Sequence, residues 1–159
     1  MSRERQDLLS RSALGVFRLN GRFLAVAEEL AGPAGLTAAW WQVLGAVLGE
    51  PLSVAGIARA MGITRQSVQR IADLLVEKGL AEYRPNPAHR RAKLLAPTGE
   101  GRAAIARIDP GHAAFADRLA QAYGEAELAQ AVAVLERLSK VLDELGPGAP
   151  PPSAPGARP

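Results

Sequence analysis

The chain has 159 residues, of which 48% are hydrophobic and 22% are charged, a composition typical of one globular domain and not of a disordered chain. It has no cysteine, which excludes a disulfide framework, a thiolate metal site and a catalytic thiol. The formal net charge is only +3, so the distribution of the charges says more about a partner than their sum does.

The N-terminal third predicts two helices. Apolar residues recur at steps of three and four from about residue 6 to residue 31, which indicates an amphipathic helix. Gly32 and Pro33 end this helix, and Thr37 caps a shorter apolar one. The uncharged stretch 30–49 is about long enough to cross a bilayer, but its proline and four glycines favour a buried core helix. We expect no membrane partner and, with no signal peptide at the N-terminus, a cytoplasmic location.

The middle of the chain predicts a mainly α fold of the winged helix-turn-helix type. Ser53 and Thr64 are natural N-caps, and Gly79 suits the residue after a helix end. The predicted elements are helices at 54–61 and 65–78 and strands near 81–84 and 93–96. Two short helices around a glycine turn, followed by a basic hairpin, form the layout of a winged helix-turn-helix domain with a two-stranded wing.

The predicted helix 65–78 has one polar face. At about 100° per residue, Arg65, Gln66, Gln69, Arg70 and Asp73 share an arc of roughly 140°, and the apolar residues lie elsewhere. Such side chains suit the DNA major groove, because arginine forks to guanine O6 and N7 and glutamine pairs with adenine N6 and N7. The alternative is an ordinary solvated face. The preceding turn and the following basic loop favour the DNA interpretation.

Positive charge concentrates in the same segment. Residues 63–98 carry seven basic and three acidic residues, a net +4, whereas the rest of the chain sums to −1. An arginine at the hairpin tip can enter a narrow minor groove, although a soluble loop tip is the alternative, and His89 suits a phosphate contact. The residues predicted to bind DNA are Ser53, Thr64, Arg65, Gln66, Ser67, Gln69, Arg70, His89, Arg90, Arg91 and Lys93.

The C-terminal third predicts two more helices. Thr98 caps the first, which residues 109–111 (Asp-Pro-Gly) are expected to kink or break. The second, 125–145, has an apolar seam suited to packing against another helix. The seam consists of Leu128, Val132, Leu135, Leu138, Leu142 and Leu145. Residues 146–159 hold six prolines and three glycines, which predicts a disordered tail.

Several of these segments resemble MarR-family transcriptional regulators. They are residues 36–44, 57–73, 79–80, 86–94 and 98–101, within a resemblance that spans about residues 8–145. Members are homodimeric winged-helix DNA binders that dimerise through their N- and C-terminal helices and are often released from DNA by small ligands. The sequence departs from the family pattern at His89, where aspartate is frequent, and at Pro97, where leucine is frequent.

The resemblance implies a division of the chain into functional parts. Residues 1–35 and 99–145 would form dimerisation helices, 36–98 the DNA-binding domain and 146–159 a tail. The helix 65–78 would be the recognition helix, and Arg90 and Arg91 would be the arginines of the wing. We therefore predict a sequence-specific transcriptional regulator, a ligand-responsive repressor, that binds a pseudo-palindromic operator as a homodimer. The alternative is a winged-helix module that binds an acidic protein.

Other constellations carry less information. Phe17, Phe23, Trp40 and Trp41 are candidates for a pocket that binds an aromatic effector, with core packing as the alternative. The two histidines, at positions 89 and 112, are too far apart in sequence for a helical metal pair. No arrangement of nucleophile, base and orienting group is evident. We expect no cofactor, no metal and no enzymatic activity.

Overall fold

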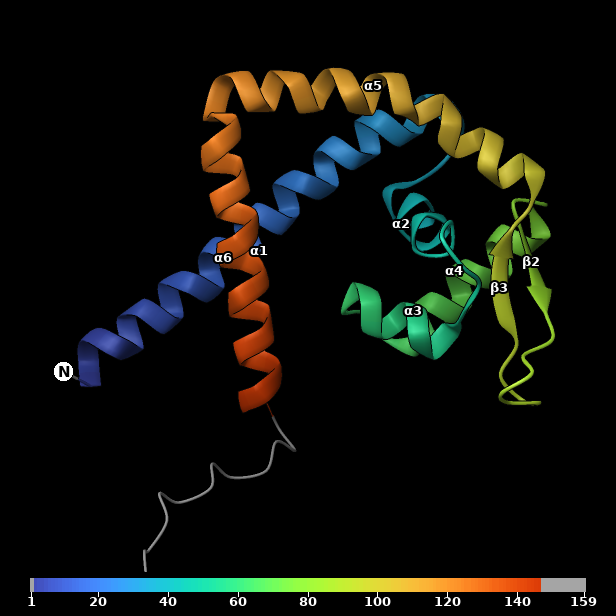
Figure 1. The fold of residues 1–159 in the computed structure, drawn as a ribbon, viewed down its shortest axis with the longest axis horizontal. Coiled ribbons are helices and arrows are strands. Elements are labelled where there is room, and N and C mark those ends of the chain that lie inside the picture. The colour runs from blue at the N-terminus through green and yellow to red at the C-terminus, as the bar shows by residue number, and fades with distance from the viewer. Residues whose placement is uncertain (1, 147–159) are drawn as a thin grey trace, which may run out of the picture. The chain divides into compact units, whose positions relative to one another are not determined.

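The structure, a computed structural model, describes residues 2–146, so the predicted tail lies almost entirely outside the described residues. The chain divides into two compact units, one ending at His112 and the other beginning at Ala113, which are described separately. The elements are α1 (Ser2–Ala31), the short 3-10 helix η1 (Gly32–Ala34), α2 (Ala38–Ala46), β1 (Leu52–Ser53), α3 (Val54–Met61), α4 (Arg65–Glu77), β2 (Ala81–Arg84), β3 (Leu94–Pro97), α5 (Gly99–Tyr123) and α6 (Glu125–Leu145) (Figure 1).

Three helices of the first unit begin at the predicted caps. The side-chain oxygens of Thr37, Ser53 and Thr64 each accept a hydrogen bond of 3.1 Å from a backbone N–H three residues later. Each bond satisfies one of the N–H groups that a helix start leaves without a partner. Gly62 and Gly79, which follow α3 and α4, have φ of +67° and +75°, a conformation that glycine adopts without strain. The helix-turn-helix is therefore set by local sequence.

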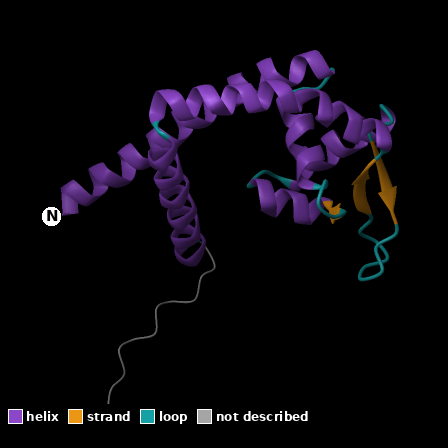
Figure 2. Cartoon of the chain, turned by 45° about the horizontal axis from the view of Figure 1, so that its top comes forward, coloured by secondary structure: helices purple, strands orange, loops and turns teal. Residues whose placement is uncertain are grey.

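The sheet has three strands, so the predicted two-stranded wing is corrected. Its order is β1-β3-β2, with both pairs antiparallel (Figure 2). Leu52 and Ser53, expected as a connector and a cap, also pair with Leu95 and Leu94 of β3. Two residues are too few for a strand periodicity to be visible. The additional strand ties the start of α3 to the base of the wing.

The core of the first unit lies among α2, α3, α4 and the sheet. Val68, Ile71 and Leu75 are buried, as the apolar face of α4 predicts. Leu44 and Ile57 bring α2 and α3 into the same apolar cluster. Among residues 2–146 no polar or charged side chain is buried, and no helix is long and apolar enough to cross a membrane.

The helix α5 is continuous across residues 109–111, where a kink or a break was expected. It continues through Pro110, although proline removes one backbone donor from the helix interior. Ile105 and Ile108, in the turns just before the proline, are buried in the core of the first unit. Burial of these residues stabilises the helix on that side against the loss of one hydrogen bond. Of the two alternatives predicted at 109–111, a kink or a break, the break is therefore wrong. The helix α1 begins at Ser2, about one turn before its predicted start.

The second unit contains α6, whose bounds agree with the predicted helix 125–145. None of its residues is buried within the chain. Val132, Leu135, Leu138, Leu142 and Leu145 of the predicted seam are exposed, Leu145 to 74%. The seam therefore forms an apolar face that the single chain does not cover.

Candidate nucleic-acid interface

The outer face of α4 is polar and does not contribute to the core. Arg65, Gln66, Gln69 and Arg70 are exposed, whereas Val68, Ile71, Ala72 and Leu75 of the same helix are buried. The helix thus presents two guanidinium groups and two carboxamides to its surroundings. Guanidinium and carboxamide groups are the ones that read base edges in the major groove.

The hydroxyl groups at the start of these helices are already engaged. Thr64 Oγ1 accepts from the backbone N–H of Ser67 and donates to Ser67 Oγ at 2.9 Å. Ser53 Oγ accepts from the backbone N–H of Gly56. Thr64 and Ser53, two of the predicted site residues, therefore cap the helices α4 and α3. A hydroxyl oxygen keeps further acceptor capacity while it caps a helix.

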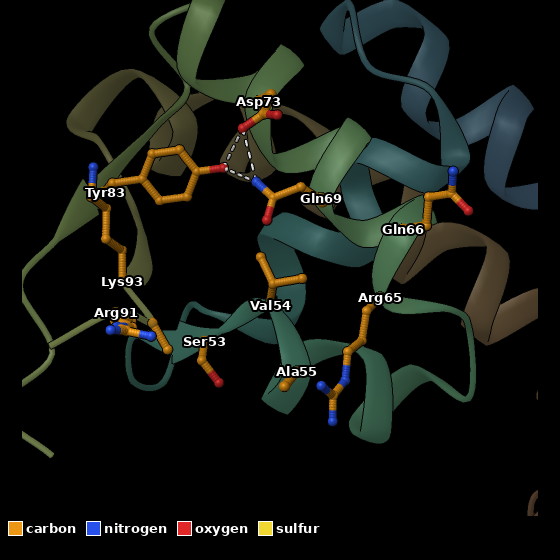
Figure 3. A pocket seen from close by; sticks show the side chains of 11 residues that line it. Ser53, Val54, Ala55, Arg65, Gln66, Gln69, Asp73, Tyr83, Arg91 and Lys93 are labelled. Atoms are coloured by element: carbon orange, nitrogen blue, oxygen red, sulfur yellow. Dashed lines mark hydrogen bonds between the residues drawn. The ribbon is translucent and has the colours of Figure 1, made fainter. Parts of the chain in front are cut away.

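A cleft of about 680 Å³ lies beside α4, and Figure 3 shows the side chains around it. Its lining residues belong to the start of α3, to α4, to β2 and to the segment just before β3. The lining residues are Ser53, Val54, Ala55, Arg65, Gln66, Gln69, Asp73, Tyr83, Arg91, Ala92 and Lys93. Six predicted DNA-binding residues are thus brought together around one hollow: Ser53, Arg65, Gln66, Gln69, Arg91 and Lys93.

Three side chains at one side of the cleft form a closed hydrogen-bond network. Gln69 Nε2 donates to Asp73 Oδ1 at 3.0 Å and to the Tyr83 hydroxyl oxygen at 2.9 Å. The Tyr83 hydroxyl donates to Asp73 Oδ1 at 2.5 Å. Figure 3 shows all three bonds as dashed lines between α4 and β2. The network joins the polar face of α4 to the first strand of the wing.

The surroundings of Tyr83 favour its protonated form. Partial burial, followed by the hydrogen bond to Asp73 and the negative charge of that carboxylate, raises the pKa of Tyr83 to about 12. Lys93 Nζ lies 5.8 Å from the centre of the Tyr83 ring, a distance at which a cation is attracted to an aromatic face. Tyr83 therefore contacts groups from α4 and from the segment that leads into β3.

The loop between β2 and β3 carries the remaining predicted residues. His89, Arg90 and Arg91 are exposed, and the loop projects away from the helices of its unit in Figures 1 and 2. Asn86 shapes it, because its carbonyl oxygen accepts from His89 N and its side chain accepts from Ala88 N. Arg91 reaches the cleft, while His89 and Arg90 are not among the cleft residues.

The predicted site omitted two of the residues that shape the cleft, Asp73 and Tyr83. Asp73 follows Gln69 by four residues, a spacing that places two side chains side by side on a helix, and this signal was available in the sequence. The position of Tyr83 depends on how β2 packs against α4, which no local pattern indicates. Arg84, a further base in this strand, pairs with Glu82 at 2.8 Å.

The four aromatic residues proposed for an effector pocket lie in different environments. Phe17 and Phe23 are exposed, the former to 70%. Trp40 and Trp41 are both half-buried and pack against the core. The Trp41 ring meets the ring of His112 edge-on, with centroids 5.5 Å apart.

The first unit has a second cleft, which none of these four aromatic residues lines. Its volume is about 470 Å³, and its lining comes from α1, α2, the end of α3 and the turn that follows. The lining residues are Asn20, Leu24, Gln42, Ala46, Ala60, Met61 and Ile63.

Within residues 2–146, no group of three or more His, Asp or Glu side chains is arranged to hold a metal ion.

Comparison of the sequence with those of known proteins identifies the family of this chain. Residues 34–92 match the sequence model of the MarR family. The uncharacterized protein Rv2011c of Mycobacterium tuberculosis is 41% identical over 122 residues, which cover 77% of this chain and 85% of the relative.

Solved structures share the fold over most of the chain. The transcriptional repressor CouR, bound to a 23-mer DNA duplex, is 27% identical with a TM-score of 0.70, and the match covers 79% of this chain and 89% of that one. BpsR of Bordetella bronchiseptica, whose DNA binding is regulated by 6-hydroxynicotinic acid, is 24% identical with a TM-score of 0.70 over 81% of this chain and 98% of that one.

Proposed function

Because this chain belongs to the MarR family and is a DNA-binding transcription regulator, we propose that it acts as a ligand-responsive repressor on a pseudo-palindromic operator. One observation carries the proposal. The polar residues of α4 stand free of the core, beside a cleft that wing residues Arg91 and Lys93 also line. The likeness to CouR, which was solved on a DNA duplex, supports the use of this face for DNA.

The DNA-contacting residues follow from this arrangement. We assign base reading to Arg65, Gln66, Gln69 and Arg70 of α4. We assign contacts with the DNA backbone to the residues around α4, because hydroxyl, imidazole and cationic groups position a protein on phosphates without reading sequence. These are Ser53, Thr64, Ser67, His89, Arg90, Arg91 and Lys93. DNA binding thus belongs to residues 36–98.

We propose that the protein acts as a homodimer. The helices α1 and α6 each carry a series of exposed large apolar residues, and grouped exposed apolar residues mark interaction surfaces. Dimerisation is therefore assigned to residues 1–35 and 99–145. A two-fold dimer that sets its recognition helices about one DNA turn, roughly 34 Å, apart reads a near-palindrome.

A small aromatic effector is the proposed signal. BpsR shares the fold and responds to an aromatic acid, and this chain has Phe17, Phe23, Trp40 and Trp41 close in sequence to the residues of the 470 Å³ cleft. A ligand acts on such a regulator by stabilising a dimer whose helix spacing does not match the groove. The proposed activity is binding and not catalysis, and it requires no cofactor. The proposed location is the cytoplasm, where a regulator meets a bacterial operator.

Two alanine variants test the assignment of the face. Arg65→Ala should relax the preference at one base position by about fivefold or more, because a bidentate arginine contact is worth about 1–3 kcal/mol. Arg90→Ala should weaken binding to all duplexes alike and reduce the slope of log affinity against log salt by about 1. The measurement is selection from a randomised duplex pool, followed by titrations at several salt concentrations.

The outcomes separate the proposal from its alternative. An enriched pseudo-palindrome supports a symmetric dimer that reads sequence. Retention of duplexes without enrichment, or identical behaviour of both variants at every salt concentration, contradicts the assignment. Failure to retain DNA, repeated after denaturing and refolding to remove a bound ligand, favours the module that binds an acidic protein.

A further inference from the structure

The carboxamide of Gln69 has both of its donors occupied within the protein. A carboxamide carries two N–H donors and one carbonyl acceptor. Gln69 Nε2 donates to Asp73 Oδ1 at 3.0 Å and to Tyr83 Oη at 2.9 Å. Only Oε1 remains available, and Figure 3 shows it pointing away from Asp73 and Tyr83 into the cleft.

The orientation of this carboxamide is fixed by the charge of its neighbour. The Asp73 carboxylate can only accept hydrogen bonds, and the Tyr83 hydroxyl has committed its one proton to it. Both atoms that face Gln69 are therefore acceptors. If the carboxamide were rotated by 180°, its oxygen would meet two acceptors and three hydrogen bonds would be reduced to one. Of the two carboxamide orientations, only the observed one keeps all three hydrogen bonds.

This arrangement changes what Gln69 can recognise. A glutamine that pairs with adenine uses both halves of its carboxamide, accepting from N6 and donating to N7. Gln69 lacks the second half, because its donors are held by the protein. The exocyclic amino groups of adenine (N6) and cytosine (N4) are the base donors that the major groove displays.

We propose that Asp73 and Tyr83 are positioning residues that make Gln69 an acceptor-only reader, selective for adenine or cytosine over guanine and thymine at one operator position. The inference rests on the proposed function, in which α4 lies in the major groove. It replaces the glutamine–adenine pairing expected from the sequence for Gln69, and it leaves that pairing open for Gln66.

Gln66 provides the contrast within the same helix. It is exposed, and none of the hydrogen bonds found among residues 2–146 involves its side chain. Its two N–H groups and its oxygen are all available to a base. The two carboxamides of α4 thus have the same chemistry but differ in what they present.

Two further observations support the positioning role of Tyr83. Partial burial, followed by the hydrogen bond to Asp73 and the charge of that carboxylate, raises the pKa of Tyr83, which reflects how firmly the hydroxyl proton is held toward Asp73. The Lys93 ammonium above the ring holds Tyr83 from the wing side. The network, which joins α4 to β2, is therefore also supported from the segment that leads into β3.

The first experiment locates the base pair that Gln69 reads. Selection from a randomised duplex pool is carried out with the full chain and with Gln69→Ala, Gln66→Ala and Arg65→Ala. We expect Gln69→Ala to remove the preference at one position where the intact protein accepts adenine and cytosine within about threefold of each other. A preference there for guanine or thymine overturns the inference.

The second experiment asks whether Gln69 donates to N7. At the identified position, adenine is replaced by 7-deazaadenine, which lacks the N7 acceptor. We expect less than a twofold loss of affinity for the intact protein. In the double variant Asp73→Ala/Tyr83→Phe the freed carboxamide should prefer adenine over cytosine and lose about fivefold or more on the modified duplex, the effect of one good base contact. Tyr83→Phe alone keeps the ring and should show the same change more weakly. This single variant replaces the double variant in the test if the double variant does not fold.

Each other result has a defined meaning. A fivefold loss for the intact protein on 7-deazaadenine shows that the network opens on DNA and overturns the inference. Unchanged preferences in both the double variant and Tyr83→Phe overturn the positioning role. If Gln69→Ala alters no position while Arg65→Ala does, the inference fails and the proposed function stands. If the intact protein enriches no duplex, the proposed function itself fails.

Discussion

Tyr83 illustrates how single side chains are tuned by their contacts. Its hydroxyl donates to Asp73 and accepts from Gln69, and its ring faces Lys93. Burial and the Asp73 carboxylate both disfavour the ionised phenolate. A residue that reads as a half-exposed strand tyrosine in the sequence is thus a link between helix and wing.

The titration of Tyr83 gives a direct test of this link. Its pKa is raised from 10.0 to about 12, so above pH 10 the unfolded chain releases a proton that the folded chain retains. The contribution of Tyr83 to stability is therefore complete below pH 10 and is lost as the pH rises toward 12. The ultraviolet absorbance of tyrosinate should show one late-titrating group, which Tyr83→Phe removes and Asp73→Asn shifts to lower pH. A late step that persists in Tyr83→Phe would refute the assignment.

At the level of elements, one joint connects α4, β3 and α5. Thr98 Oγ1 donates to the carbonyl oxygen of Gly79 at 2.6 Å and accepts from Gly101 N at 3.1 Å. Thr98 N donates to the carbonyl oxygen of Leu80 at 3.1 Å. Thr98 thus provides hydrogen-bond partners for the carbonyl groups that follow α4 and for an N–H group in the first turn of α5. The wing strands leave and return at this joint.

Gly101 should be intolerant of any side chain. A Cβ at this position would overlap the carbonyl oxygen of Leu80, which the hydrogen bond from Thr98 holds in place. Gly101→Ala should therefore lower the free energy of unfolding by about 1–3 kcal/mol, the range typical of overpacking. Denaturant unfolding at fixed protein concentration measures it.

Gly45→Ala is the matched control for this substitution. Gly45 lies in α2, is exposed and has no atom within 4 Å of the added Cβ. Alanine is favoured over glycine in a helix by up to about 1 kcal/mol, so the control should lose no stability. An equal loss in both variants would contradict the steric explanation.

The sequence predicted those parts of the fold that local chemistry determines. Thr37, Ser53 and Thr64 cap their helices because a hydroxyl and the N–H groups it satisfies lie within three residues of one another. The pairing of Leu52 with Leu95 joins residues far apart in the chain, and two residues leave no periodic pattern. The site divides in the same way, since Arg65, Gln66, Gln69 and Arg70 share a predictable helix face, whereas the approach of Tyr83 depends on tertiary packing.

At the scale of the whole molecule, the exposed apolar faces predict self-association. Leu138 and Leu142 lie one turn apart on α6 and are exposed. Leu138→Arg/Leu142→Arg places two charges in the proposed interface, where an unpaired charge is costly. We expect the dimer dissociation constant to rise at least tenfold and operator binding to fall with it, as measured by sedimentation and by DNA titration.

Ala133→Arg controls for the added charge. Ala133 is exposed on the opposite side of α6 from the apolar seam, so a charge there should leave the dimer intact. If the double variant sediments as the intact chain does, α6 is not the dimerisation element. If the two variants dissociate equally, the effect comes from charge and not from the apolar face.

The division of α4 into a buried apolar face and a free polar face has a consequence for how such regulators diverge. Arg65, Gln66 and Arg70 make no core contact, so a duplicated copy of the chain can change its operator through these positions one at a time while it keeps its fold. Gln69 is different, because its replacement leaves Asp73 and Tyr83 with an unfilled partner site. In the proposed scheme, the base read at this position therefore depends on residues of both the helix and the wing, whereas each of the other three positions depends on one residue of the helix.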